Sequence, residues 1–142
     1  MRQYLIVANL TLGRAELWRE VRERMTAGPC RFHVLAPAAH EPRSGAYTEV
    51  QNEGEAAQRV EHMLARLHEM GAEATSEIGD IRPFDAVLDT IERDGPIYDE
   101  ILLSTLPASV SKWLGLDLVS KLRRNLDIPI THVIGATEPA ET

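Results

Sequence analysis

Four hydroxyl side chains gather in one short segment that leads from an apolar run into a helical pattern. They are Ser104, Thr105, Ser109 and Ser111, and Lys112 follows them. Hydroxyls and backbone N–H groups at the start of a helix are suited to binding an anion, because the helix dipole favours negative charge there. The same residue types also serve as helix caps, so a purely structural role is the alternative interpretation.

Catalysis and metal binding are the other chemistries to weigh. Ser104 could act as the nucleophile of a small serine hydrolase, with His132 on a neighbouring strand as its base. The Gly-x-Ser-x-Gly turn that exposes such a nucleophile does not surround Ser104. The five histidines are scattered, and no two are three or four residues apart, the spacing that places two metal ligands together on a helix. We therefore expect no enzymatic activity and no metal site.

The hydroxyl-rich segment lies between two predicted strands. Residues 99–104 form an apolar run entered through acids, as in a strand buried on both faces, and residues 130–134 are rich in β-branched side chains. The apolar positions at helical spacing between them are Val110, Trp113, Leu114, Leu118 and Leu122. This spacing predicts one helix of roughly four turns. A strand, a helix and a strand make a right-handed parallel crossover, and ligands bind beyond the carboxyl ends of such strands.

The same alternation runs through the whole chain. Further strands are predicted at 4–9, 30–36 and 72–78, and further helices at 14–27, 55–70 and 84–94. Five strands alternating with four helices favour a three-layer α/β/α sandwich with a single five-stranded parallel sheet, a Rossmann-like fold. The strand at 72–78 has the weakest pattern and is expected at the sheet edge. The long connection at 40–54 is expected to be either a lid over the site or a variable surface loop.

Length and composition favour one domain. The 142 residues are 44% hydrophobic and 26% charged, and we assign residues 1–136 to this domain and 137–142 to a short flexible tail. The net charge of −7 argues against nucleic acid or an anionic membrane as a partner. No apolar run approaches the roughly 20 residues of a membrane span. A lone cysteine, Cys30, fits a reducing compartment, so we expect a cytoplasmic protein.

The element order and several markers resemble the universal stress protein (UspA-like) family over nearly the whole chain. The residues that carry the resemblance are Gly79, Asp80, Pro83, Gly95, Asp99 and Pro129. They are similar to that family's turn before the third helix, its fourth strand and the proline before its last strand. The resemblance implies a sheet ordered 3-2-1-4-5, as in the adenine nucleotide alpha hydrolase-like fold, and a role in a stress response.

The resemblance also bears on assembly and ligands. Such proteins usually form homodimers through the last strand, which here carries Thr131, His132, Val133 and Ile134. The ATP-binding branch of the family has a glycine motif after the fourth strand. Placed there without gaps, the motif falls on Ser104, Pro107, Asp117 and Leu118, none of which matches it. Asn9 stands where the family uses an aspartate near the adenosine. The resemblance thus implies a divergent member that lacks the ATP-binding glycine motif.

We therefore expect a non-catalytic regulatory or ligand-sensing module, homodimeric or with another protein partner, that needs neither ATP nor AMP as a cofactor. The alternative is a nucleotide- or anion-binding protein with an altered phosphate loop. Its ligand-binding residues would be Asn9, Thr11, Ser104, Thr105, Ser109 and Ser111. These face one another if the fourth strand lies beside the first. If Leu10, Leu106 and Trp113 fill the space between those strand ends, this alternative loses its site.

Overall fold

The computed structural model describes residues 1–38, 49–109, 111, 113 and 117–137, with side chains from residue 55 onward in its second helix. The elements are β1 (Arg2–Val7), α1 (Ala15–Ala27), β2 (Cys30–Pro37), α2 (Glu49–Glu69), β3 (Glu73–Gly79), α3 (Pro83–Asp94), β4 (Glu100–Thr105), α5 (Leu118–Asn125) and β5 (Ile130–Ile134). All strand pairs are parallel, and the strand order is β3-β2-β1-β4-β5. The predicted sheet and its order are confirmed, and β3 is an edge strand as expected.

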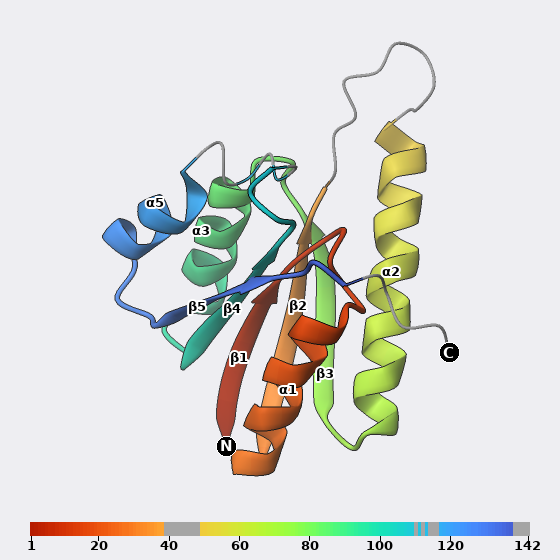
Figure 1. Cartoon of the computed structure of the whole chain (residues 1–142). Helices are drawn as coiled ribbons and strands as arrows, with labels where there is room; N and C mark the ends of the chain where they lie inside the picture. The colour runs from red at the N-terminus through yellow and green to blue at the C-terminus, as the bar shows by residue number, and fades with distance from the viewer. Residues whose placement is uncertain (39–48, 110, 112, 114–116, 138–142) are drawn as a thin grey trace.

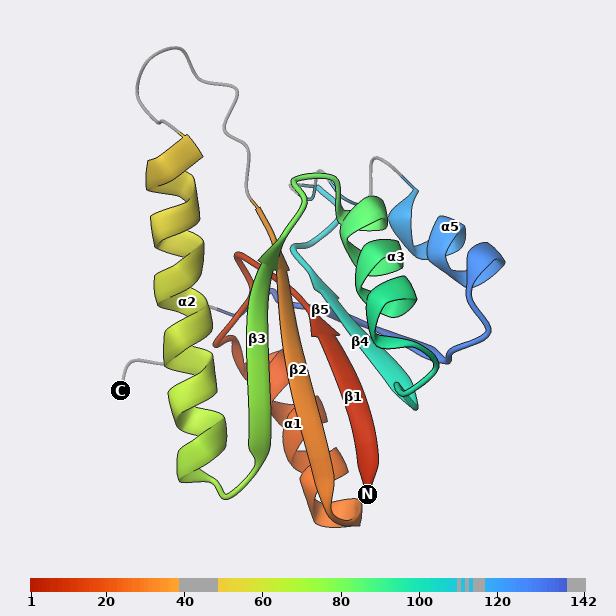
Figure 2. The same cartoon turned by 180° about the vertical axis from the view of Figure 1, so that it is seen from behind.

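Helices cover the sheet on both sides. The chain winds outward from β1 to β3, then crosses back to β4 and continues to β5. Because each crossover is right-handed, this reversal sends α1 and α2 to one face and α3 and α5 to the other (Figures 1 and 2). The predicted three-layer sandwich is therefore confirmed. In the described part of the chain, none of the helices combines the length and the apolar character needed to cross a bilayer.

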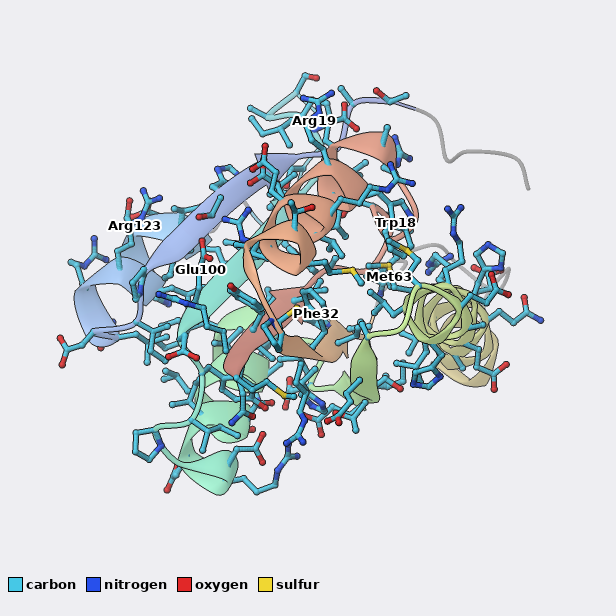
Figure 3. All side chains as sticks on the ribbon, turned by 90° about the horizontal axis from the view of Figure 1, so that it is seen from below. Trp18, Arg19, Phe32, Met63, Glu100 and Arg123 are labelled. Atoms are coloured by element: carbon cyan, nitrogen blue, oxygen red, sulfur yellow. The ribbon has the colours of Figure 1, made fainter. Side chains whose placement is uncertain are left out.

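Two apolar clusters hold the layers together. Neighbouring residues of a strand point to opposite faces, so Leu5 and Ile6 of β1 join different clusters. On the α1 and α2 side, Ile6 packs with Phe32, Trp18 and Met63, all nearly or fully buried (Figure 3). Each such side chain contributes about 1.5–3 kcal/mol when it leaves water. An apolar cluster therefore lies on each face of the sheet, and Trp18 anchors α1 as expected.

Two helix boundaries differ from the predictions. Helix α2 already begins at Glu49, so the end of the expected loop at 40–54 is helical. The lid hypothesis concerns residues 40–54, of which 40–48 lie outside the described residues, so it stays a prediction. The single helix expected after residue 110 does not form, because Asp117 has a left-handed backbone (φ 55°) and α5 begins after it. A left-handed residue interrupts the helical hydrogen bonds, and apolar spacing does not reveal it.

Around the break at Asp117, the structure describes residues 111, 113 and 117 onward. Trp113 is half-buried and packs against the cluster on the α3 and α5 side. Residues 110, 112 and 114–116, including the expected cation Lys112, lie outside the described residues. Thr137, where the flexible tail was expected to begin, donates its backbone N–H and its hydroxyl to the Glu16 carboxylate over 3.0 and 2.8 Å. The domain boundary at residue 136 stays a prediction.

Candidate functional site

The carboxyl ends of β1 and β4 lie side by side in the middle of the sheet, where the winding direction reverses (Figure 1). Ligands of open α/β sheets bind at such a switch point. Four of the six predicted site residues come together here and are buried, with exposed fractions of 3% or less: Asn9, Thr11, Ser104 and Thr105. The structure thus brings these four residues to one place, as the sequence predicted.

The hydroxyls in this group bond within the fold. The oxygens of Thr11 and Ser104 lie 2.6 Å apart, and Thr105 Oγ1 lies 2.8 Å from His132 Nε2 on β5. Burial, aided by the positive charge of Arg123, lowers the pKa of His132 and favours its neutral ring. Ser104 therefore meets a threonine hydroxyl, whereas the histidine that a serine hydrolase would need beside it is bonded to Thr105.

Asn9 connects three elements. Its Nδ2 donates to the carbonyl oxygen of Pro37 at the end of β2, over 2.7 Å. Its Oδ1 accepts from Nε and Nη2 of Arg59 on α2, over 3.0 and 2.7 Å. Burial lowers the pKa of the Arg59 guanidinium, and the negative charge of Glu55 opposes this only in part. Among the described residues Arg59 forms no ion pair. Both of its side-chain hydrogen bonds end on the neutral Oδ1 of Asn9.

Arg14 belongs to the same loop between β1 and α1 as Asn9 and Thr11. Its Nη1 donates to the carbonyl oxygen of Gly135 over 3.2 Å, and its Nε is buried without a hydrogen-bond partner among the described residues. Gly135 in turn donates its N–H to the carbonyl oxygen of Thr105. A Cβ at Gly135 would lie 2.8 and 2.9 Å from side-chain carbons of Thr11. The chain leaving β5 therefore packs directly against the loop that follows β1.

The remaining predicted residues lie apart from the buried group. Ser109 is exposed and Ser111 is half-buried. The backbone N–H of Ser111 donates to the carbonyl oxygen of Pro107 over 2.9 Å, which closes a turn after β4. Leu106 is half-buried and Leu10 is 47% exposed, so Leu10 does not fill the space between β1 and β4. The direct contact between Thr11 and Ser104 spans it instead.

Sequence reasoning missed both arginines. Arg59 stands beside the buried positions Ala56, Val60 and Met63 of α2, and a charged residue so close to an apolar stripe is the only signal that could have singled it out. Arg14 precedes the first residue of α1 and looks like an ordinary solvated charge in the sequence. Long side chains reach across elements, and their targets are set by packing rather than by spacing along the chain.

A second polar cluster joins β2, β3 and α3. The Glu77 carboxylate accepts hydrogen bonds from Arg93 over 2.6 and 3.0 Å, and from Thr90 over 2.9 Å, and lies 3.1 Å from His33 Nε2. The bonds to Arg93, then those to His33 and Thr90, lower the pKa of Glu77 to about 2 although burial opposes this. Beside the cluster is an open cavity of about 620 Å³, lined by the starts of β1, β2 and β3. No group of three or more potential metal ligands occurs among the described residues.

Comparisons with known proteins add a fold relationship. No protein-family model and no curated protein matches this sequence. Among solved structures, a universal stress protein family protein from Arabidopsis thaliana with AMP bound is similar over 94% of this chain and 92% of that chain, with a TM-score of 0.65 and 11% identity. A universal stress protein from Archaeoglobus fulgidus is similar over 94% and 93%, with a TM-score of 0.58 and 14% identity. Together with the strand order β3-β2-β1-β4-β5, these similarities show that the chain has the UspA-like fold of the universal stress proteins.

Proposed function

We propose that this chain is a non-catalytic regulatory module that senses a small ligand at its switch point and acts as a homodimer. The observation that supports this role is the pairing of the buried hydroxyls. Ser104 bonds to Thr11, and His132 bonds to Thr105, so the serine has no base to activate it in this arrangement. A buried polar site without an activated nucleophile suits binding better than group transfer.

A turnover assay tests the non-catalytic part of the proposal. The purified chain is incubated with ATP and, separately, with an activated phenyl ester, and released phosphate or phenol is measured. We expect no release above the level of a Ser104→Ala variant. Release that Ser104→Ala abolishes would favour the small serine hydrolase and would reject this part of the proposal.

The homodimer rests on the edge strand β5. Strand β5 ends the sheet, and its outer edge has no strand partner among the described residues. Its last residue, Ile134, is 46% exposed. Unpaired edges of this kind are usually paired or covered, since their N–H and C=O groups otherwise recruit other strands. We propose that Thr131, His132, Val133 and Ile134 pair with the same residues of a second copy.

Light scattering after size exclusion tests the dimer at micromolar concentration. We expect a dimer for the wild-type chain and a monomer for Ile134→Lys, which places a charge at the paired edge. The matched control is Ile97→Lys, because Ile97 is a similarly exposed isoleucine (40%) outside β5. A wild-type monomer, or equal loss of the dimer in both variants, would reject pairing through β5.

An adenine nucleotide binder with an altered phosphate loop is the second candidate. It is favoured by the similarity to the Arabidopsis structure, which has AMP bound. Denaturing mass spectrometry of the purified protein, followed by calorimetry with ATP and AMP, tests it. A stoichiometric nucleotide or a micromolar dissociation constant would put this candidate first.

For location we propose the cytoplasm, in keeping with a lone buried cysteine, Cys30.

A further inference from the structure

We infer that Arg59 is an anion-recognition residue of the switch point, whose guanidinium, held in place by Asn9, binds the phosphate or carboxylate group of a small organic ligand. This inference rests on the proposed ligand-sensing role. It depends neither on the homodimer nor on the absence of catalysis.

The first argument is the unmatched charge of Arg59. The side chain is half-buried, and buried charges are normally paired with an opposite charge because removing them from water is costly. Its two hydrogen bonds go to the neutral amide oxygen of Asn9. The nearest acid that influences it, Glu55, is exposed and forms no ion pair with it. Among the described residues, therefore, Glu55 offsets the charge of this guanidinium only in part, and no carboxylate pairs with it directly.

The second argument is the geometry of the guanidinium. An arginine has five N–H donors in a planar fork, which matches the two oxygens of a carboxylate or phosphate. The bonds to Asn9 use Nε and Nη2, and Nη1 has no hydrogen-bond partner among the described residues. The edge of the fork formed by Nη1 and the second hydrogen of Nη2 is thus available for a bidentate contact.

The third argument is the way Asn9 is held. The bond from its Nδ2 to the carbonyl oxygen of Pro37 orients the amide so that Oδ1 faces Arg59. An aspartate at this position would form an ion pair with Arg59 and neutralise it. Asparagine holds the same geometry without a charge, which leaves the positive charge free for a ligand. Arg14, in the same loop between β1 and α1 as Asn9, adds a second cation near this end of the sheet.

Three probes separate the chemical classes of ligand. Inorganic phosphate, succinate and AMP are titrated into the wild-type chain, and both the melting temperature and the calorimetric affinity are measured. We expect at least one probe to raise the melting temperature in a concentration-dependent way. Stabilisation by phosphate and AMP would identify a phosphate ligand, and stabilisation by succinate would identify a carboxylate. Failure of all three would overturn the inference.

Four variants then test the role of Arg59. Arg59→Gln should weaken the binding of the active probe by about tenfold or more, and Arg59→Lys by less, because lysine keeps the charge but not the fork. Asn9→Asp should abolish binding, since the new carboxylate pairs with Arg59 and neutralises its charge. The matched control is Arg66→Gln on the same helix, because the Arg66 guanidinium lies over the Trp18 ring, 4.9 Å from its centroid, away from Asn9. It should bind within about twofold of wild type.

The outcomes distinguish this inference from the proposed function. Equal weakening in Arg59→Gln and Arg66→Gln would mean unspecific attraction and would reject a role for Arg59. Unchanged binding in Asn9→Asp would reject it as well. A probe that binds wild type and Arg59→Gln equally would uphold ligand sensing while removing Arg59 from it. A monomeric chain, or turnover that depends on Ser104, would reject the proposed function and leave the anion site standing.

Discussion

The side-chain oxygens of Thr11 and Ser104 lie 2.6 Å apart, although 93 positions separate the two residues in the sequence. Both residues are buried, and this hydrogen bond connects the loop after β1 to the end of β4. The two hydroxyl groups at the switch point therefore hydrogen-bond to each other. The contact therefore decides which groups remain available to a ligand, and it directs attention to the arginines around it.

Removing one hydroxyl should cost stability. Ser104→Ala leaves the Thr11 hydroxyl buried without its partner, and we expect a loss of about 1–3 kcal/mol in the free energy of unfolding. The Thr11→Val, Ser104→Ala double variant should lose less than the sum of the two single variants, since it leaves no orphaned hydroxyl. Urea denaturation measures all three. The exposed Ser109→Ala serves as control, and additive single losses would argue against direct coupling.

Gly135 should not tolerate a side chain. A Cβ there would lie within 2.9 Å of Thr11 Cβ and Cγ2, and a β-branched side chain next to the backbone has little room to move. We expect Gly135→Ala to lower the free energy of unfolding by about 1–3 kcal/mol through overpacking. Thermal unfolding followed by circular dichroism measures this. Ala136→Ser, at the neighbouring exposed position, should leave the melting temperature unchanged, and an equal shift in both variants would contradict the packing argument.

The Glu77 cluster should make the free energy of unfolding depend on pH in the acidic range. Its pKa in the folded protein, about 2, lies below the ordinary value of 4.5, so the carboxylate stabilises the fold above the ordinary value. This contribution is lost as the pH falls from 4.5 toward 2. A quarter of the side chain is exposed and solvent screens the ion pair, so we expect about 1–2 kcal/mol.

The comparison of wild type with Glu77→Gln measures this contribution. The difference in the free energy of unfolding should be largest near about pH 6 and shrink toward about pH 2.5. A difference that stays constant over this range would show that the ionisation of Glu77 does not stabilise the fold. Glu92→Gln serves as control, because that carboxylate lies on α3, next to Arg93, and is exposed.

The ion pair between Arg24 and Glu100 should contribute more to the free energy of unfolding than the exposed pair between Arg31 and Glu73. Arg24 Nη2 lies 2.8 Å from Glu100 Oε2, and the two side chains are only 15% and 17% exposed. Arg24→Met leaves the Glu100 carboxylate largely buried without its cation, which should cost about 3–5 kcal/mol. Arg31→Met breaks a pair of similar distance whose side chains are 47% and 58% exposed, and should cost about 1 kcal/mol or less. Chemical denaturation of both variants tests this, and equal losses would contradict the effect of burial.

Local patterns in the sequence predicted most of the fold. Alternating apolar runs and helical stripes placed the strand at 130–134 with its observed bounds, and placed the helix that ends at Ala27 before Gly28 and Pro29. These features depend on neighbouring residues, so periodicity reveals them. The break at Asp117 and the early start of α2 at Glu49 were missed, because a single backbone angle or a few helical residues leave no clear period.

By itself, the sequence determined the alternation of strands and helices, and therefore which polar residues follow the strands that meet at the switch point. Only the tertiary structure decided the partners of those residues. Thr11 meets Ser104, and Arg59 reaches Asn9 from a helix 50 positions away. Apolar spacing is a local property of the chain, whereas a hydrogen bond between distant side chains forms only where packing brings their atoms within about 3 Å of each other. The contact of Arg59 with Asn9 is therefore a product of packing that the sequence alone did not reveal.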